Sequence, residues 1–180
     1  SGKYAYTVSN AAAGTCNSTT NTGCELQIYD VSNPSNPLFA GGTDSGGNNT
    51  LSIFISGRYA YVGIAINAGT CSSTDNTGCE LQIYDVSNPN SPLYVGGANN
   101  TGGNITSVFV SGRFAYTVDT GGEFRIYDIS NPASPLQIGN ITPGVQINSI
   151  FISGRYAYVG DSDGTFRIYD VSNPYSPTQI

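Results

Sequence analysis

Histidine is absent from the 180-residue sequence, as are methionine and tryptophan. Without histidine the chain cannot build a Ser-His-Asp or Cys-His catalytic set, and a zinc site with histidine ligands is excluded for the same reason. A primary translation product begins with methionine, whereas this sequence begins with Ser1. We therefore expect a processed or partial form of a longer polypeptide.

Charge is also scarce, at 10% of the residues against about 25% in typical soluble proteins. The six basic residues and a net charge of −6 leave no basic patch for nucleic acid or for an anionic membrane. No apolar run approaches the roughly 20 residues of a membrane span, and no signal peptide is visible. The 38% of hydrophobic residues is nevertheless enough for one domain with a real core.

An internal repeat organises the chain. The segment "SGRYAY" begins at Ser56 and Ser153, and close variants begin at Ser1 and Ser111. The spacings are 55, 55 and 42 residues, and the last copy ends after 28 residues. The two long units differ from the third mainly by an insert ahead of "YD". The common unit of about 42 residues fits a propeller blade or a helical HEAT unit. Residues 1–180 are treated as a single domain or segment, with units starting at 1, 56, 111 and 153.

The apolar pattern within each unit decides between those two folds. Runs of four to six residues rich in Ile, Val, Tyr and Phe are bounded by Gly, Asn and Pro, and no window keeps a 3.6-residue period. Each unit has four such runs, here named A ("SIFI"), B ("RYAYV"), C ("LQIYD") and D ("LYVGG"). Their two faces are both apolar, as expected for a blade between two others. The predicted fold is an all-β propeller of four-stranded blades, with four blades visible and the first lacking its innermost strand A.

Each unit contains one aspartate at the end of run C and one cation after its Ser-Gly turn. A metal or catalytic role would not need four equivalent copies, so we favour a structural role in the "SNPxSP" turn, where Asp and Ser accept backbone hydrogen bonds. The cations are interpreted as solvated turn charges or as partners of an aspartate within the same blade. The aspartates are Asp30, Asp85, Asp128 and Asp170, and the cations are Lys3, Arg58, Arg113 and Arg155.

The nine-residue motif resembles the third-strand segment L-R-I-I-D-V-S-N-P of the LVIVD-repeat family, which occurs in secreted and surface proteins of bacteria and archaea. With "SGRYAYV" upstream, the similarity covers almost the whole chain outside two cysteine-bearing inserts. It implies a propeller but no active site, because the family has no agreed catalytic residues. The four copies of the motif are Leu26–Pro34, Leu81–Pro89, Phe124–Pro132 and Phe166–Pro174.

The two inserts contain all four cysteines, in "CNSTTNTGC" (Cys16 to Cys24) and "CSSTDNTGC" (Cys71 to Cys79). Four cysteines allow three pairings, and equal spacing in two equivalent loops favours Cys16–Cys24 and Cys71–Cys79. The competing metal site lacks histidine and any close cysteine pair, and a catalytic cysteine would lack a histidine base. Disulfides in turn indicate an extracellular or cell-surface location.

Five sequons for N-glycosylation occur, a number only slightly above chance for this composition. In an up-and-down blade the B–C loops and D–A connections emerge at one face, and both cysteine loops belong to that face. One face is therefore expected to be long-looped, disulfide-braced and glycosylated. The candidate residues, all in or near these loops, are Asn17, Asn48, Asn99, Asn104 and Asn140.

Catalytic and metal-binding patterns are weak. "DSDG" at Asp161–Gly164 resembles the start of a calcium loop without its remaining ligands. Asp161 and Asp163 are therefore weak metal candidates, and a hairpin turn is favoured. Tyr94 and Tyr175 lie outside the repeated tyrosine positions and are the surface aromatic candidates. No cofactor is expected. Paired carboxylates for glycoside chemistry would come from Asp44, Asp75, Asp119, Glu123, Asp161 and Asp163.

Two functional classes stay open. The first is a non-enzymatic structural or adhesive module of the cell exterior that associates with itself, in a ring or a filament, or with other surface proteins. The second is a propeller that binds a carbohydrate or another ligand at its long-looped face. A propeller hydrolase or lyase is a remote alternative. The missing strand A further predicts that these 180 residues do not form a closed four-bladed monomer. Further blades of a longer chain, a strand from another copy, or an open array would each resolve that edge.

Overall fold

A computed structural model describes residues 2–10, 16–17, 20–46, 49–65, 70–72, 74–100 and 102–180. These residues form fifteen β-strands and no helix. No helix of the described residues is therefore long and apolar enough to cross a membrane. The strands are short because Gly, Asn and Pro interrupt the apolar runs every five to seven residues.

The described strands form four antiparallel sheets, and in each sheet strands that follow one another in sequence are paired. Sheet 1 consists of β1 (Tyr4–Val8), β2 (Leu26–Asp30) and β3 (Leu38–Thr43). Sheet 2 consists of β4 (Thr50–Ser56), β5 (Tyr59–Ile64), β6 (Leu81–Asp85) and β7 (Leu93–Ala98). Sheet 3 consists of β8 (Ile105–Ser111), β9 (Phe114–Asp119), β10 (Phe124–Asp128) and β11 (Leu136–Ile141). Sheet 4 consists of β12 (Ile147–Ser153), β13 (Tyr156–Asp161), β14 (Phe166–Asp170) and β15 (Thr178–Gln179).

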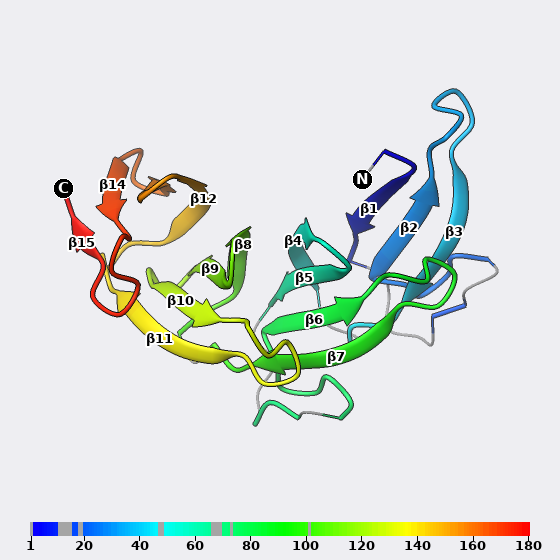
Figure 1. The fold of residues 1–180 in the computed structure, drawn as a ribbon, viewed down its shortest axis with the longest axis horizontal. Helices are drawn as coiled ribbons and strands as arrows, with labels where there is room; N and C mark the ends of the chain where they lie inside the picture. The colour runs from blue at the N-terminus through cyan, green and yellow to red at the C-terminus, as the bar shows by residue number, and fades with distance from the viewer. Residues whose placement is uncertain are drawn as a thin grey trace.

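The four sheets follow one another around an arc (Figure 1). The first strands of sheets 2, 3 and 4, which are β4, β8 and β12, lie side by side on the inner side of the arc, and β7 and β11 form its outer rim. The N- and C-termini lie at opposite ends, so the described strands do not close into a ring (Figure 1). The blade-like sheets and their number agree with the sequence prediction, as does the three-stranded first sheet.

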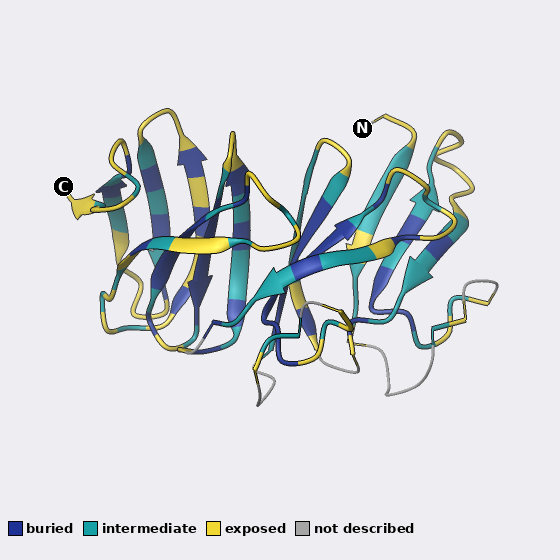
Figure 2. Ribbon diagram, turned by 60° about the horizontal axis from the view of Figure 1, so that its bottom comes forward, coloured by how far each residue is buried: buried dark blue, intermediate teal, exposed yellow. Residues whose placement is uncertain are grey.

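Alternation along the strands gives each sheet two apolar sides. We name the side toward the following sheet the forward side and the side toward the preceding sheet the back side. In sheet 2, Tyr61 and Leu81 on the forward side pack with sheet 3, whereas Val62 and Tyr84 on the back side pack with sheet 1. The same positions pack sheet 3 against sheet 4. The buried residues therefore concentrate in the strands, and the turns at both edges are largely exposed (Figure 2).

A glycine in the last strand of each of sheets 1 to 3 receives the "SNPxSP" turn of the following sheet. A Cβ atom added to Gly96 in β7 would lie 2.6 Å from the carbonyl oxygen of Ala133. Gly41 in β3 and Gly139 in β11 approach the carbonyl oxygens of Pro89 and Pro174 in the same way. The repeated motif therefore does more than turn the chain, because its first proline and the residue that follows also dock one sheet onto its neighbour.

Candidate binding surfaces

The turns and loops that connect the strands lie at two different edges of the arc. The short-turn edge holds the Ser-Gly turns and the "SNPxSP" turns, and the long-loop edge holds the cysteine loops and the connections between sheets. At the long-loop edge these segments contact one another, since the Asn76 side chain of the second cysteine loop donates a hydrogen bond to the carbonyl oxygen of Asp44 at 3.2 Å. Asp44 follows β3, so the loop and the sheet connection share one edge as predicted.

At the short-turn edge, each cation pairs with the aspartate of its own sheet. Lys3 Nζ lies 3.2 Å from Asp30 Oδ2, and the other three pairs are Arg58–Asp85, Arg113–Asp128 and Arg155–Asp170. This confirms the interpretation of partners within one blade. In each sheet the aspartate Oδ1 also accepts the backbone N–H of the serine two residues later, at 2.9 Å. The four aspartates are thus structural acceptors in a charged turn.

These contacts lower the pKa of each turn aspartate. Arg113, helped by the N–H and hydroxyl of Ser130, lowers the pKa of Asp128 to about 2. The Ser172 hydroxyl, followed by Arg155, lowers the pKa of Asp170 to about 2. Both carboxylates are therefore ionised at any physiological pH, which does not suit a general acid.

A cavity of about 410 Å³ lies at the short-turn edge between sheets 1 and 2. One wall is formed by β1, and the other by the two turns of sheet 2. Between sheets 2 and 3, Phe54 of β4 lies opposite Tyr61 and belongs with Tyr59 to one apolar cluster. Sheet 1 places no such strand beside β1 in the described residues. The lining residues are Tyr4, Tyr6, Gly57, Arg58, Val86, Ser87 and Pro89.

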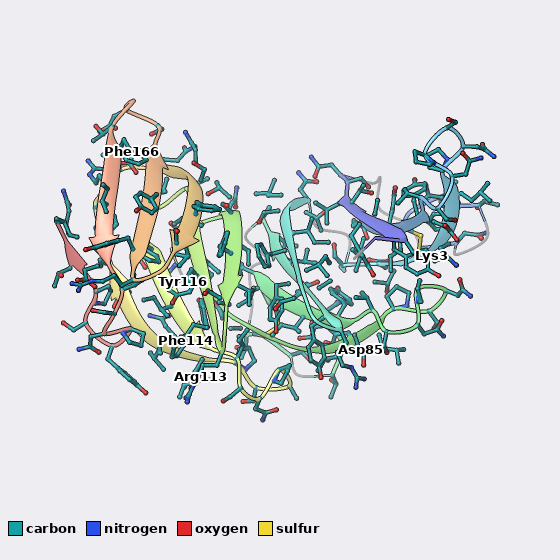
Figure 3. All side chains as sticks on the ribbon, turned by 45° about the horizontal axis from the view of Figure 1, so that its top comes forward. Lys3, Asp85, Arg113, Phe114, Tyr116 and Phe166 are labelled. Atoms are coloured by element: carbon teal, nitrogen blue, oxygen red, sulfur yellow. A yellow bond between two sulfur atoms is a disulfide. The ribbon has the colours of Figure 1, made fainter. Side chains whose placement is uncertain are left out.

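The two end sheets expose sides that are buried elsewhere in the arc. Phe166 on the forward side of sheet 4 is 65% exposed, whereas its counterparts Leu26, Leu81 and Phe124 are each 0% exposed. Phe166 lies on the outermost sheet at the C-terminal end of the molecule, and Lys3 marks the opposite end (Figure 3). Phe151 of β12 is exposed on the same sheet. The end sheets therefore present apolar surface that the inner sheets bury.

Both cysteine loops are closed by disulfides at the long-loop edge. Cys16 is bonded to Cys24 and Cys71 to Cys79, each pair separated by eight residues in sequence. This is the pairing within loops that the equal spacing favours. Cys24 and Cys79 are fully buried, so each disulfide anchors its loop to the sheet.

Tyr94 is not the free surface aromatic that the sequence suggested. Its hydroxyl donates to the carbonyl oxygen of Ser72 at 2.9 Å, and its ring packs edge-on against Tyr84 at 5.7 Å. Burial raises the pKa of Tyr94 to about 12. Phe39 packs on Tyr29 at the same position of sheet 1, so this aromatic pair was a usable sequence signal. Tyr175, in contrast, is 64% exposed.

The sequon asparagines differ in accessibility. Asn17 is exposed in the first cysteine loop, and its backbone pairs with Thr22. Asn140 is exposed near the end of β11. Asn99 and Asn104 are half-buried beside the connection between sheets 2 and 3. Asn48 lies outside the described residues, as does part of each cysteine loop.

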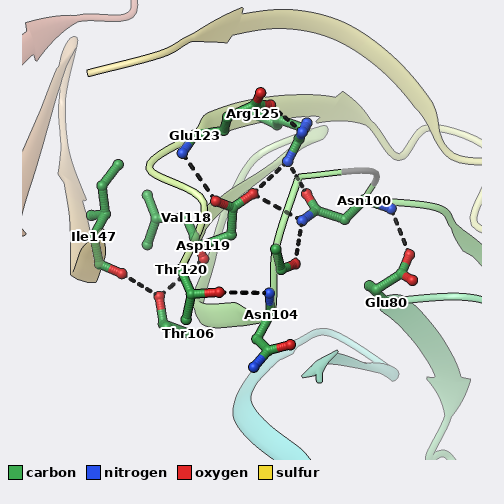
Figure 4. A network of polar contacts seen from close by, with 11 residues as sticks. Glu80, Asn100, Asn104, Thr106, Val118, Asp119, Thr120, Glu123, Arg125 and Ile147 are labelled. Atoms are coloured by element: carbon green, nitrogen blue, oxygen red, sulfur yellow. Dashed lines mark hydrogen bonds and ion pairs between the residues drawn. The ribbon is translucent and has the colours of Figure 1, made fainter. Parts of the chain in front are cut away.

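A polar cluster at the long-loop edge is buried between sheets 2 and 3 (Figure 4). Arg125 Nη1 donates to Asp119 Oδ2 at 2.6 Å, and the Asn100 side-chain amide donates to the same oxygen at 2.9 Å. The backbone N–H of Asn100 donates to Glu80 Oε2 at 2.6 Å. Arg125 also pairs with Glu123. The cluster therefore fixes the connection of sheet 2 onto the β9–β10 hairpin of sheet 3.

This cluster contains two of the six candidate catalytic carboxylates. Asp119 and Glu123 share one buried guanidinium, and Asp119 is fully buried, so no substrate can reach it. The sequence reasoning missed Arg125, Asn100 and Glu80. The signal was the position of Arg125 in run C, where sheets 1 and 2 have glutamine.

The weak metal candidates have other contacts. Asp161 pairs with Arg167, and Asp163 Oδ1 accepts the backbone N–H of Thr165 at 2.9 Å. Gly164 N–H donates to the carbonyl oxygen of Asp161, which closes the β13–β14 hairpin. In the described part of the chain, no three cysteine or acidic side chains form a cluster that could hold a metal ion.

The geometry of short, repeated, stacked sheets has a counterpart among known families. The family model of the LVIVD repeat matches the chain five times, over residues 22–44, 47–68, 76–99, 102–142 and 146–180. The chain belongs to the LVIVD-repeat family. These matches contain β2 to β15, so the LVIVD repeat accounts for nearly all of the arc.

Solved structures similar to this LVIVD-repeat chain are propeller-like, at identities that show the fold alone. A 6-phosphogluconolactonase candidate from Bacteroides fragilis superimposes with a TM-score of 0.69 and 10% identity, over 96% of this chain and 49% of that one. The β-propeller domain of Cps50 (Swd1) from Myceliophteria thermophila gives 0.64 and 13%, over 86% and 51%. The computationally designed Ika4 protein gives 0.61 and 11%, over 92% and 91%. The chain thus spans about half the length of the first two. No curated protein matches it in sequence.

Proposed function

We propose that this LVIVD-repeat chain is a non-enzymatic structural module of the cell exterior, which associates end to end through its two terminal sheets. The observation that carries the proposal is the exposed forward side of sheet 4. Phe166 is 65% exposed at a position that is 0% exposed in the other three sheets. Burying a phenylalanine side chain contributes about 1.5–3 kcal/mol, so a further sheet on this side would be stabilised.

Sheet 1 offers the complementary side. Tyr29, on its back side, is half-buried, whereas the equivalent tyrosines of sheets 2, 3 and 4 are at most 1% exposed. Pro34 in the "SNPSNP" turn of sheet 1 is exposed, although the equivalent prolines Pro89 and Pro174 dock onto glycines of a preceding sheet. The two ends therefore carry the two halves of an interface that repeats inside the molecule.

Contact between two different surfaces of identical subunits is heterologous, and it builds a ring if the rotation closes and a filament if it does not. Two copies of an arc that spans about half of a larger propeller chain would suit a ring. The disulfides Cys16–Cys24 and Cys71–Cys79 support an oxidising location outside the cytosol. The resemblance to a family of secreted and surface proteins supports the same location.

Sedimentation velocity across a wide range of concentration tests the proposal. The chain should pass from 18.8 kDa to dimers or larger species as its concentration rises. Phe166→Glu should keep it at the monomer mass, because a carboxylate would be buried without a partner. Leu136→Glu is the matched control, since Leu136 is also 65% exposed but lies on β11 away from the end sheet.

A chain that stays monomeric at every concentration would overturn the proposal. So would equal loss of association in the Phe166→Glu and Leu136→Glu variants, since association would then depend on general hydrophobicity. Binding of a glycan by a strictly monomeric chain would favour the ligand-binding alternative instead.

A further inference from the structure

The inner edge of β1 carries backbone groups that face away from the rest of its sheet. In sheet 1 the order is β1-β2-β3, so β1 is an edge strand. The N–H of Val31 donates to the carbonyl oxygen of Lys3, and Ser9 N–H donates to the carbonyl oxygen of Glu25. In an antiparallel pair these bonds alternate along the strand. Tyr4 and Tyr6 therefore direct their N–H and C=O groups away from β2.

In the other three sheets, the equivalent edge is paired with a strand of one recurring pattern. The tyrosine equivalent to Tyr6 lies opposite a phenylalanine, in the pairs Phe54–Tyr61, Phe109–Tyr116 and Phe151–Tyr158. Each phenylalanine is flanked by two β-branched residues, in the sequences "SIFIS", "SVFVS" and "SIFIS". In three sheets, the strand that pairs with the tyrosine strand in this register thus carries the same pattern of side chains.

The cavity at the short-turn edge adjoins the position of that aromatic side chain. Its walls include Tyr6, the counterpart of the Tyr61 that lies opposite Phe54, and also Tyr4, the counterpart of Tyr59. The inner phenylalanines also form a row, with ring centroids 4.6 Å apart for Phe54–Phe109 and 5.2 Å for Phe109–Phe151. A phenylalanine opposite Tyr6 would extend this row beyond Phe54.

We propose that the inner edge of β1, together with the adjoining cavity, binds an extended segment of the pattern Ser-Ile-Phe-Ile-Ser by antiparallel strand addition. The backbone groups of Tyr4 and Tyr6 provide the hydrogen bonds, and the cavity receives the central aromatic side chain. The occupant is a strand A of this repeat, the kind of strand that pairs at this edge in the other three sheets. This site goes beyond end-to-end stacking, because it requires only a strand and not a whole sheet.

A synthetic peptide with the sequence of residues 147–154, "INSIFISG", is the probe. The recipient is the Phe166→Glu variant, whose change lies on the opposite end sheet and leaves β1 intact. Isothermal titration should show one binding site. In hydrogen exchange followed by NMR, the Tyr6 amide should become protected on binding, whereas the Ala5 amide, which bonds to β2, should be protected with and without peptide.

Two N-methylated peptides form a matched pair of controls. Methylation of the phenylalanine nitrogen removes a donor that faces β1 and should weaken binding about tenfold, as expected for one lost backbone hydrogen bond. Methylation of the following isoleucine nitrogen, which faces away from β1, should leave binding nearly unchanged. A peptide of scrambled sequence should bind much more weakly than the parent.

Absence of binding by the parent peptide would overturn the proposal. Equal weakening by both methylations, or binding of the scrambled peptide as tightly as the parent, would also overturn it, because either shows a contact without backbone register. If the peptide binds but the chain never self-associates, the strand-binding site is supported and end-to-end association is refuted. The two proposals can therefore fail separately.

Discussion

At the scale of single residues, the glycines that receive the "SNPxSP" turns leave no room for a Cβ atom. Gly96 has no room for a Cβ atom because the carbonyl oxygen of Ala133 would lie 2.6 Å from it. Gly96→Ala should therefore force the turn of sheet 3 away and lower the free energy of unfolding by about 1–3 kcal/mol. Chemical denaturation measures the change.

Gly2→Ala is the control for that substitution, because nothing lies within 4 Å of a Cβ atom at Gly2. It should change the free energy of unfolding by no more than about 0.5 kcal/mol. Equal effects of the two substitutions would show that the turn does not dock on the glycine.

Two kinds of ion pair differ in their expected contribution. Arg125 is buried with Asp119, so Arg125→Met should lower the free energy of unfolding by about 3–5 kcal/mol, because it leaves a buried carboxylate without its partner. Arg113→Ala breaks the exposed pair with Asp128 and should leave stability nearly unchanged, since solvent screens such pairs. Thermal unfolding of both variants side by side makes the comparison. A larger loss for Arg113→Ala would contradict it.

At the scale of elements, most strands could be predicted from sequence because β-branched and aromatic runs are separated by Gly, Asn and Pro. The run at Leu26–Pro34 predicts β2 and its turn, and the structure has β2 at Leu26–Asp30. The pairing of Arg58 with Asp85 could also be anticipated, since both recur once per unit.

The sequence could not predict the contacts between repeat units. The docking of Ala133 on Gly96 joins residues 37 positions apart, and neither residue is unusual within its own unit. The cluster around Arg125 depends on Asn100 of the preceding sheet, which only the packing of two sheets brings within reach. The register shifts at Ile28/Tyr29 and Ile83/Tyr84 are likewise not marked by any distinctive residue types in the sequence. Local patterns specify strands, whereas the stacking of sheets selects these partners.

Each disulfide closes a short loop that projects from one sheet. Loop closure of this length contributes about 2–3 kcal/mol at most. Reduction of both disulfides should therefore lower the melting temperature by at most roughly 10–20 °C and leave the far-UV circular dichroism of the sheets intact. Peptide mapping without reduction should link Cys16 to Cys24 and Cys71 to Cys79. Disulfides between the two loops, or loss of the sheet signal on reduction, would contradict the prediction that each loop is closed by its own disulfide.

At the scale of the whole molecule, the absence of histidine predicts a broad pH plateau of stability, from about pH 5 to pH 9. Asp128 and Asp170 have folded pKa values of about 2, below the usual 3.8, so their contribution is present above about pH 4 and is lost as the pH falls toward 2. Burial raises the pKa of Tyr94 and Tyr127 to about 12. Their contribution is present below about pH 10 and is lost as the pH rises toward 12.

Urea unfolding at stepped pH values, together with phenolate absorbance, measures both limits. The buried tyrosines should ionise only as the protein unfolds in base. The Asp128→Asn and Asp170→Asn double variant should show a smaller loss of stability in acid than the unmodified chain. Ionisation of all thirteen tyrosines in one step without unfolding would contradict the burial of Tyr94 and Tyr127.

The arc also predicts that stability is distributed unevenly along the chain, because each sheet of the described residues makes its main contacts with its sequence neighbours. Phe124 and Phe166 occupy the same repeat position, but Phe124 is buried between sheets 3 and 4 and packs on Tyr169, whereas Phe166 is exposed. Phe124→Ala should lower the free energy of unfolding by about 3–5 kcal/mol, and Phe166→Ala should change that of the monomer by no more than about 0.5 kcal/mol.

Hydrogen exchange should be slowest in β5, β6, β9 and β10, which lie between two neighbouring sheets, and faster in β1, β2 and β14. If the chain associates through sheet 4, Phe166→Ala should instead destabilise the assembled form. The loss should be in proportion to the area that Phe166 buries in the assembly. Uniform exchange along the chain at concentrations where it is monomeric would show instead that the four sheets unfold as one unit.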